Sequence, residues 1–219
     1  VIQSNGFKIH SLFLIELKKK YDDIKISQTF SGEGIVLAQN NAKGIIIKGV
    51  DFTNKEDTQF LEKNISEGDL TNINKNSVFI GAELAFDLGL NIGDRVNLMS
   101  SAFISTPFGS LPKQDTFIIS GIFNTGFFEF DKNFAILNLP NALSIFDKNN
   151  NEKNLEIYLK NPLKADLIKE EIKKINKNFF VYSWSDLNKS FFSALKVERN
   201  VMFIILTLIL IVAAFNIIS

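Results

Sequence analysis

The chain contains no cysteine, which excludes disulfide bonds and thiolate metal sites. Its only histidine, His10, has no second histidine or cysteine with which to share a metal or a catalytic role. Neither charge is in excess, because 24 basic residues balance 24 acidic ones. A protein that binds nucleic acid usually shows a basic excess, so we expect no nucleic-acid partner.

Motifs of enzymes are also missing. The sequence has no G-x-x-x-x-G-K-[ST] phosphate loop and no G-x-S-x-G nucleophile turn. The carboxylate pairs Asp22-Asp23 and Glu170-Glu171 are flanked by lysines, which is typical of solvated helix faces. These absences predict a protein that is not an enzyme, with no catalytic residues, no metal and no cofactor.

The segment from Val201 to Ser219 contains no charged residue. A helix of this length, at about 1.5 Å per residue, nearly matches the roughly 30 Å hydrocarbon core of a bilayer. A charged stretch, Lys196 to Asn200, precedes it. We therefore predict one transmembrane helix, with the preceding residues forming a water-exposed domain. Val1 to Ser4 is typical of a strand rather than of a signal peptide, so we expect a spanning helix upstream of this sequence.

Apolar residues at three- and four-residue steps predict amphipathic helices over 9–24 and 162–175. Leu163, Leu167, Ile168, Ile172 and Ile175 would form the buried stripe of the second helix. A short helix is expected over 82–88, ended by Gly89, and a weaker one over 58–64. A further helix would start at Asp186 and run without a break into the membrane span.

Strands are predicted over 1–4, 25–30, 34–38, 44–50, 95–99, 116–123, 134–139, 155–159 and 179–183. The order of elements indicates an α+β fold in which two β-α-β parts form one split sheet. Residues 1–51 and 152–184 would form this porter-like subdomain, and 52–151 an inserted β-rich subdomain. Residues 185–219 would form the juxtamembrane and transmembrane helix.

Two stretches resemble a known family. Ile80 to Leu98, IGAELAFDLGLNIGDRVNL, resembles a signature of the extracytoplasmic domains of MacB/FtsX-type ABC permeases. Trp184 to Ser219, WSDLNKSFFSALKVERNVMFIILTLILIVAAFNIIS, resembles the entry to the second membrane helix of the LolC/LolE lipoprotein-releasing permeases. The resemblance covers essentially the whole chain and extends from after the first membrane helix into the second.

The resemblance implies a periplasmic domain of a permease subunit in the inner membrane of a Gram-negative bacterium. Such permeases work with a separate LolD-like ATPase and a second LolE/LolC-like permease subunit. They extract acylated lipoproteins from the membrane and pass them to a soluble LolA-like carrier. The missing phosphate loop agrees with ATP hydrolysis on another polypeptide.

The segment from about residue 100 to 114 contains several apolar residues and two prolines, and we expect it to protrude. Because proline cannot donate to a sheet ladder, this arm is not expected to be a regular paired hairpin. In LolC-type subunits the loop at this place is a hook that binds the carrier. The matching residues are Thr106, Pro107, Phe108, Gly109, Ser110, Leu111 and Pro112. The alternative is a surface loop packed on its own domain.

The family's hook stands on a pad that often carries basic residues. The matching positions here are Asn97, Gln114 and Asp115, of which Asn97 and Asp115 lack positive charge. Lys113 is a possible substitute. This departure puts the charge pattern of carrier docking in doubt, because electrostatic complementarity mainly tunes association rate and specificity.

Aromatic residues Trp184, Phe191 and Phe192 precede the apolar segment and are predicted to anchor the helix at the membrane interface. The run from Gly126 to Phe130 could line a lipid path, although core or hairpin packing is the more common role. Two other functions remain open: a MacB/FtsX-like permease for efflux or for regulation of cell-wall hydrolases, and a membrane-anchored sensor or adhesion module. A MacB/FtsX-like permease would not need the hook, so the hook distinguishes it from a LolC-like function. The remainder of the gene distinguishes a sensor or adhesion module, because a four-span permease next to an ATPase gene excludes it.

Overall fold

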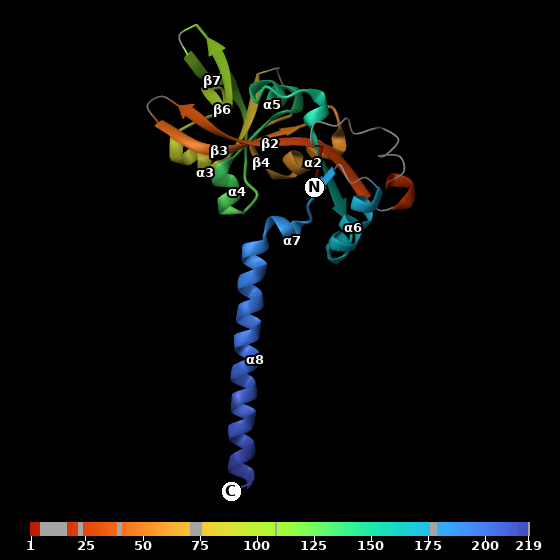
Figure 1. The fold of residues 1–219 in the computed structure, drawn as a ribbon. Coiled ribbons are helices and arrows are strands. Elements are labelled where there is room, and N and C mark those ends of the chain that lie inside the picture. The colour runs from red at the N-terminus through yellow and green to blue at the C-terminus, as the bar shows by residue number, and fades with distance from the viewer. Residues whose placement is uncertain are drawn as a thin grey trace.

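The computed structural model describes residues 1–4, 17–21, 24–38, 41–70, 76–107, 109–175 and 179–218. Most of these residues form a mixed β-sheet with helices packed on it, which we call the head. One long helix extends from the head (Figure 1). The strands are β1 (Ile2–Ser4), β2 (Ile24–Ala38), β3 (Asn41–Val50), β4 (Ile65–Gly68), β5 (Ser77–Gly81), β6 (Arg95–Thr106), β7 (Gly109–Phe123), β8 (Phe134–Asn138), β9 (Asn154–Leu159) and β10 (Phe179–Val181). The helices are α2 (Lys55–Asn64), α3 (Ala82–Leu88), α4 (Phe128–Asn133), α5 (Leu139–Ile145), α6 (Ala165–Ile175), α7 (Trp184–Leu187) and α8 (Lys189–Ile218), with 3₁₀ turns η1 (Asn150–Glu152) and η2 (Pro162–Lys164).

Part of the sheet closes on itself. The pairings β2–β3, β3–β8, β8–β5, β5–β7, β7–β6 and β6–β2 form a ring of strands. One face of each strand contributes to the main hydrophobic core, through residues such as Val36, Ile47, Val78, Leu98 and Leu137. Closure removes free strand edges, so the ring is a stable base for the β6–β7 arm described below.

Two predicted strands, 25–30 and 34–38, form the single strand β2. Residues 31–33, which separate the two predicted strands, belong to β2, and Gly32 and Gly34 both lie inside it. A Cβ atom on Gly32 would lie 2.5 Å from the ring of Phe146, and one on Gly34 would lie 2.7 Å from the carbonyl oxygen of Met99. The glycines therefore permit close packing on the strand and do not end it.

The first half of β2 pairs with β9, and β1 joins β9 to β10. This side of the sheet is covered by α6 and has its own hydrophobic cluster, which includes Ile2, Leu17, Leu155, Ile172 and Val181. The sequence analysis divided the head into one subdomain of residues 1–51 and 152–184 and an inserted subdomain of residues 52–151. One continuous sheet crosses these boundaries, so the division remains a prediction.

The stripe predicted for the helix over 162–175 is wrong in part. Ile172 is buried and Ile168 packs against the cluster, but Leu163 is 81% exposed and Leu167 is 68% exposed. Ile175 is also exposed. The first turn is the 3₁₀ turn η2, whose tighter winding changes the direction of Leu163 relative to the α-helical residues.

Residues 9–24 were predicted as one helix. Of these, 17–20 are helical, whereas Ile24 already begins β2. Residues 9–16 and 22–23, including His10, lie outside the described part of the chain, as does Asn40 of the predicted turn. The prediction of α3 with Gly89 as its end is confirmed: Gly89 adopts the left-handed conformation with φ 63° and caps the helix.

The C-terminal helix is not continuous from Asp186. The short α7 ends at Asn188 (φ −113°, ψ 32°), and α8 starts at the next residue. α8 is long and apolar enough to cross a membrane and extends away from the head (Figure 1). Its 30 residues correspond to about 45 Å, so its first turns extend beyond a hydrocarbon core of roughly 30 Å.

Candidate functional site

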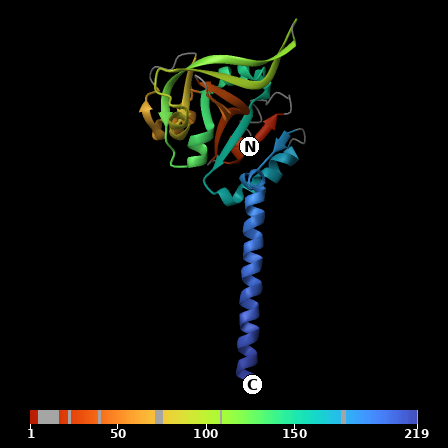
Figure 2. The same cartoon turned by 90° about the vertical axis from the view of Figure 1, so that its left-hand side faces the viewer.

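The β6–β7 arm projects from the head on the side opposite α8, as both views show (Figures 1 and 2). It is a paired antiparallel hairpin, which corrects the expectation of an irregular loop. At its end Phe103 pairs with Pro112, Ile104 with Leu111, Ser105 with Ser110 and Thr106 with Gly109.

Two features explain why the prolines are tolerated in the arm. Pro107 lies in the connection between the strands and not in the ladder. Pro112 lies in the outer part of the arm, where, among the described residues, β6 and β7 pair only with each other. The other side of each strand is therefore an unpaired edge, and a residue without an N–H fits such an edge. The connection also uses Gly109, whose φ of 124° favours glycine, and the Thr106 hydroxyl donates to the Gly109 carbonyl at 2.7 Å.

The outer arm exposes large apolar side chains. Phe103 is 64% exposed, Leu111 is 59% exposed, and Ile104 is also exposed. Phe108, which belongs to the predicted hook, lies outside the described residues. At the base of the same strands, by contrast, Val96 and Phe117 are buried in the main core. The hairpin therefore has a rigid, buried base and an exposed apolar end.

Ser100 fixes the point where the arm leaves the head. Its hydroxyl donates to the Ile145 carbonyl at 2.6 Å and accepts from the Ala102 N–H at 3.1 Å. The register of the strands shifts between Met99 and Phe103, which marks a bulge. Because bulges bend a strand pair, this position sets the direction of the arm.

The predicted pad residues do not form one surface. Asn97 pairs with Thr116 and accepts a hydrogen bond from its hydroxyl at 2.7 Å. Gln114 shares this face of the hairpin, whereas Asp115 pairs with the buried Leu98 and so projects from the other face. Lys113 forms an ion pair with Asp147 at 3.1 Å.

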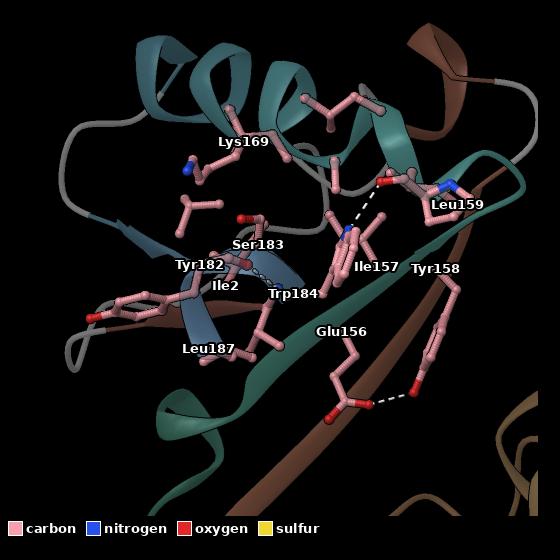
Figure 3. Close-up of a pocket in the computed structure, with 16 residues that line it drawn as sticks. Ile2, Glu156, Ile157, Tyr158, Leu159, Lys169, Tyr182, Ser183, Trp184 and Leu187 are labelled. Atoms are coloured by element: carbon pink, nitrogen blue, oxygen red, sulfur yellow. Dashed lines mark hydrogen bonds between the residues drawn. The ribbon is translucent and has the colours of Figure 1, made fainter. Parts of the chain in front are cut away.

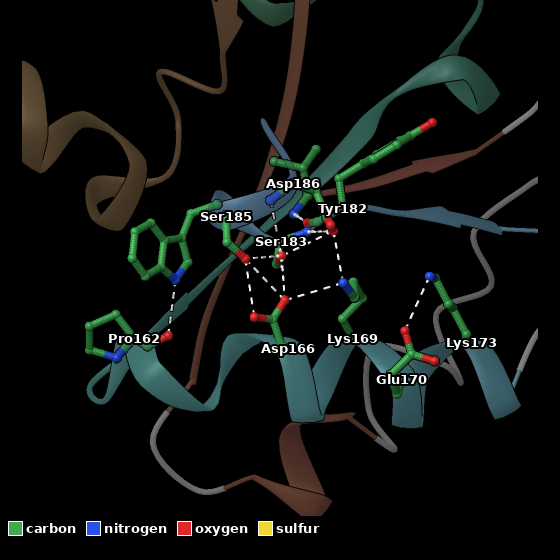
Figure 4. A network of polar contacts seen from close by, with 11 residues as sticks. Pro162, Asp166, Lys169, Glu170, Lys173, Tyr182, Ser183, Ser185 and Asp186 are labelled. Carbon is green, nitrogen blue, oxygen red and sulfur yellow. Dashed lines mark hydrogen bonds and ion pairs between the residues drawn. The ribbon is translucent and has the colours of Figure 1, made fainter. Parts of the chain in front are cut away.

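A polar cluster binds α7 to α6 (Figure 4). Asp186 accepts from the Ser183 N–H at 2.9 Å and forms an ion pair with Lys169 at 2.9 Å. Asp166 accepts from the hydroxyls of Ser183 at 2.7 Å and Ser185 at 3.1 Å, and pairs with Lys169 at 3.2 Å. These residues were not identified from the sequence. The available signal was Ser183-x-x-Asp186, a capping pattern that marks a new helix start.

The predicted membrane anchors occupy both sides of the break at Asn188. The Trp184 indole donates to the Pro162 carbonyl at 3.0 Å and packs edge to face on Phe192, with ring centroids 4.9 Å apart. Phe191 is exposed and contacts Phe192. Trp184 therefore connects η2, α7 and the start of α8; anchoring at the membrane interface remains a prediction.

The α6–α7 cluster predicts an acid-sensitive junction. The hydrogen bond from the Ser183 N–H, followed by that from Lys169, lowers the pKa of Asp186 from its ordinary value of 3.8 to about 2. Since the folded pKa is the lower one, the stabilisation is complete above about pH 4 and is lost as the pH falls toward 2. Fluorescence of Trp184, the only tryptophan of the chain, should report this loss in an acid titration.

Asp186→Asn removes the charge and serves as the comparison in that titration. Its Trp184 signal should already differ at neutral pH, and its change between pH 4 and 2 should be smaller than in the wild type. The remaining change comes from Asp166, whose pKa is also lowered by the hydrogen bonds from Ser183 and Lys169. Identical acid transitions in the wild type and in Asp186→Asn would show that Asp186 does not control the junction.

A cavity of about 350 Å³, the base pocket, lies between α6, α7 and strands β1, β9 and β10 (Figure 3). Its walls are mainly apolar and include Ile2, Ile157, Ile168, Leu187 and Trp184. The pocket therefore adjoins the connection to α8. The described residues contain no group of three or more histidine, cysteine or acidic side chains that could hold a metal ion.

The run from Gly126 to Phe130 forms a turn and the start of α4. Asp131, which is buried, accepts hydrogen bonds from the Thr125 N–H at 3.0 Å and from its hydroxyl at 2.8 Å. Phe130 stacks on Phe134 with centroids 4.1 Å apart, whereas Phe127 is exposed. Core packing accounts for Phe130; a lipid path along this run remains untested.

Comparison with known proteins adds sequence relatives. No protein-family model matches the chain. It is 31% identical over 144 residues to the lipoprotein-releasing system transmembrane protein LolC of Xylella fastidiosa strain 9a5c, covering 65% of this chain and 35% of that protein. LolC of Buchnera aphidicola from Acyrthosiphon pisum is 31% identical over 208 residues, covering 91% of this chain and 50% of that protein. The chain thus spans about a third to a half of these relatives.

Among solved structures, the periplasmic region of MacB from Actinobacillus actinomycetemcomitans superposes with a TM-score of 0.51 and 11% sequence identity, covering 84% of each chain. At this identity the likeness concerns the fold alone. The MacB-like mixed sheet agrees with the α+β class predicted from the sequence. The sequence relatives show that the chain belongs to the LolC-like permeases.

Proposed function

We propose that the chain is the periplasmic part of a lipoprotein-releasing permease and that the tip of its β6–β7 arm docks a soluble LolA-like carrier. The observation that carries this proposal is the position of the arm. It projects away from α8, and hence from the proposed membrane, and exposes apolar side chains (Figure 2). An exposed apolar surface of this kind is typical of a protein-binding site.

The arm is suited to binding because its base is fixed. Ser100 ties it to α5, and the ring of strands buries Val96 and Phe117 below it. A prearranged binding element loses little conformational entropy when a partner docks. The hook would comprise Thr106 to Pro112, including Phe108, with Phe103 and Ile104 extending its apolar surface.

The remaining roles follow from the same proposal. The subunit would reside in the bacterial inner membrane with its head in the periplasm, held by α8. A LolD-like ATPase would hydrolyse ATP, and a second LolC/LolE-like subunit would complete the permease. Acylated lipoproteins would be the cargo. Trp184, Phe191 and Phe192 would contact lipid at the interface.

The pad contributes less charge than the family pattern implies. Asn97 and Gln114 share one face of the hairpin and offer amide groups, while Lys113 is paired with Asp147. We therefore propose that carrier docking depends on the apolar tip more than on electrostatic attraction.

Carrier capture tests this function. The full chain, in nanodiscs, is immobilised and exposed to the LolA-like carrier of the same organism. Deletion of Thr106 to Leu111, or Pro107→Ala, should abolish capture. A loss of roughly 100-fold corresponds to about 2.8 kcal/mol of binding free energy.

Phe86→Ala is the matched control, because Phe86 is an exposed phenylalanine on α3, outside the arm. It should leave capture unchanged. Thermal unfolding of each variant checks that the head is intact. Full capture by the deletion variant, with an intact head, would refute the docking role of the hook.

A further inference from the structure

A second cavity, of about 480 Å³, lies between α2 and one face of strands β2, β3 and β9; we call it the α2 pocket. Its lining residues include Thr29 from β2, Lys48 from β3, Glu156 from β9, and Asp57 and Phe60 from α2. With Phe130 from α4 and Ile136 from β8, the pocket is formed by six elements that are distant in the sequence, and none of these lining residues belongs to the arm.

Two buried acceptors in this pocket lack a partner. Thr29 is 2% exposed and Asp57 is 9% exposed. Within the described part of the chain, neither Thr29 Oγ1 nor Asp57 Oδ1 has a hydrogen-bond partner. The Thr29 hydroxyl lies near Glu156 and contributes to the lowered pKa of that carboxyl. Ser27 lies near Asp57 and opposes the rise in the Asp57 pKa. The other Asp57 oxygen accepts from Asn54 Nδ2 at 3.1 Å.

An unpartnered buried polar group destabilises a fold by about 1–3 kcal/mol, and more if it is charged. Two such oxygens lining one cavity therefore form a site with unmet demand for a donor. Burial raises the pKa of the Asp57 carboxyl above its ordinary value, which is the direction expected of a carboxylate without enough donors.

Lys25 also lines the pocket, and its positive charge acts on the Asp57 carboxyl. Lys48 and Glu156 are paired with each other. Lys48 Nζ lies 2.9 Å from both oxygens of Glu156, and the Tyr158 hydroxyl donates to the same carboxylate at 2.5 Å (Figure 3 shows the Tyr158 contact). Lys63 is exposed, so solvent screens its charge. The Lys48–Glu156 ion pair is therefore satisfied, whereas Thr29 Oγ1 and Asp57 Oδ1 have no hydrogen-bond partner within the described residues.

The remaining wall is apolar. It is formed by Val50, Phe60, Leu61, Phe130 and Ile136. Phe60 and Phe130 meet edge to face with centroids 5.7 Å apart. A pocket with a few convergent polar atoms and an apolar wall is the usual form of a small-molecule site.

We propose that the α2 pocket binds a small molecule that presents an N–H donor group, an ammonium or amide, on an apolar body. The donor group lies between Thr29 Oγ1 and Asp57 Oδ1, and the apolar body packs on Phe60 and Phe130. This site is separate from the proposed carrier-docking arm.

Two probes test the proposal: benzylamine, which is an ammonium at neutral pH, and N,N,N-trimethylbenzylammonium. They share the ring and the charge, but only the first has N–H donors. With the full chain in nanodiscs, ligand-observed NMR should show binding of benzylamine, and binding of the trimethyl compound should be at least about tenfold weaker.

Variants assign the contact atoms. Asp57→Asn and Thr29→Val should each weaken benzylamine binding roughly tenfold, while Gln59→Ala, at an exposed position of the same pocket, should change it less than about twofold. Thr29→Val should also raise the unfolding temperature of the unliganded protein, because it removes an unpartnered buried hydroxyl.

Absence of benzylamine binding at roughly 10 mM would overturn the proposal and indicate that water alone fills the pocket. Equal binding of the two probes, or unchanged binding in both Asp57→Asn and Thr29→Val, would overturn it as well. Carrier capture is measured separately, so failure here leaves the function of the arm unaffected.

Discussion

Gly81→Ala should prevent the head from folding stably. Gly81 is the last residue of β5, directly before α3, and a Cβ atom there would lie 2.0 Å from the carbonyl oxygen of Asp131 and 2.5 Å from its carbonyl carbon. Both are backbone atoms, which cannot rotate away. The φ of Gly81 is −71°, so the effect is steric and does not arise from an unusual backbone angle.

Overpacking of a close contact typically costs about 1–3 kcal/mol, and a backbone clash this short lies at or beyond the upper end. A domain that is stable by roughly 5–15 kcal/mol loses much of its margin. Circular dichroism during thermal unfolding measures the loss.

Gly44→Ala is the control for this substitution. Gly44 also lies in a strand, has no unusual φ, and a Cβ atom there would meet nothing within 4 Å. Its free energy of unfolding should change by less than about 0.5 kcal/mol. Equal unfolding temperatures for the two variants would contradict the close approach of β5 and α4.

The second large effect is expected for Phe79→Ala, with a loss of about 3–5 kcal/mol. Phe79 is fully buried on β5 and belongs to the third hydrophobic cluster with Leu61, Phe123 and Ile136. Its ring meets Phe52 edge to face at 5.6 Å, and a Cβ atom on Gly121 would lie 2.7 Å from it. Removing the ring would leave a cavity between the sheet and α2 that rigid strands cannot fill.

Phe86→Ala provides the comparison for Phe79→Ala, since Phe86 is 84% exposed. Urea unfolding of both variants should give a midpoint well below the wild type for Phe79→Ala and close to it for Phe86→Ala. Similar midpoints for the two variants would show that the third cluster contributes little to stability.

The sequence predicts elements well where a local signal is strong. Ala82 to Leu88 followed by Gly89 forms a helix with a left-handed end as expected, and the apolar C-terminal segment forms the long helix α8. The short helices α4 and α5 were not predicted from the sequence. They have too few turns to show a helical period and are held by packing, as with Leu139 and Ala142 against Gly49.

Two predictions failed because they needed tertiary information. Residues 25–30 and 34–38 were predicted as two strands, but they form one strand in which Gly32 and Gly34 permit close contacts with Phe146 and Met99. Pro112 was read as incompatible with a hairpin, but the outer part of the arm leaves a free edge for it. The closure of the ring between β6 and β2 brings together residues that no local pattern relates.

The candidate site shows the same limit. The sequence predicted a protruding segment with apolar side chains, which the β6–β7 arm is, whereas the separation of Asp115 from Asn97 and Gln114 depends on strand register. The α2 pocket depends on six elements, and its two open acceptors, Thr29 and Asp57, have no distinctive sequence pattern.

The break at Asn188 determines how movement could pass between α8 and the head. α7 is held to α6 by the Lys169–Asp186 ion pair, whereas α8 is joined to α7 through Asn188 and the Trp184–Phe192 ring contact. Asn188 donates to the Trp184 carbonyl through its Nδ2 at 2.8 Å and accepts from the Phe192 N–H at 3.1 Å. The backbone angles of this one residue therefore set the direction in which α8 leaves the head. A tilt of α8 by about 10° relative to the head displaces the far end of this helix, about 45 Å away, by roughly 8 Å.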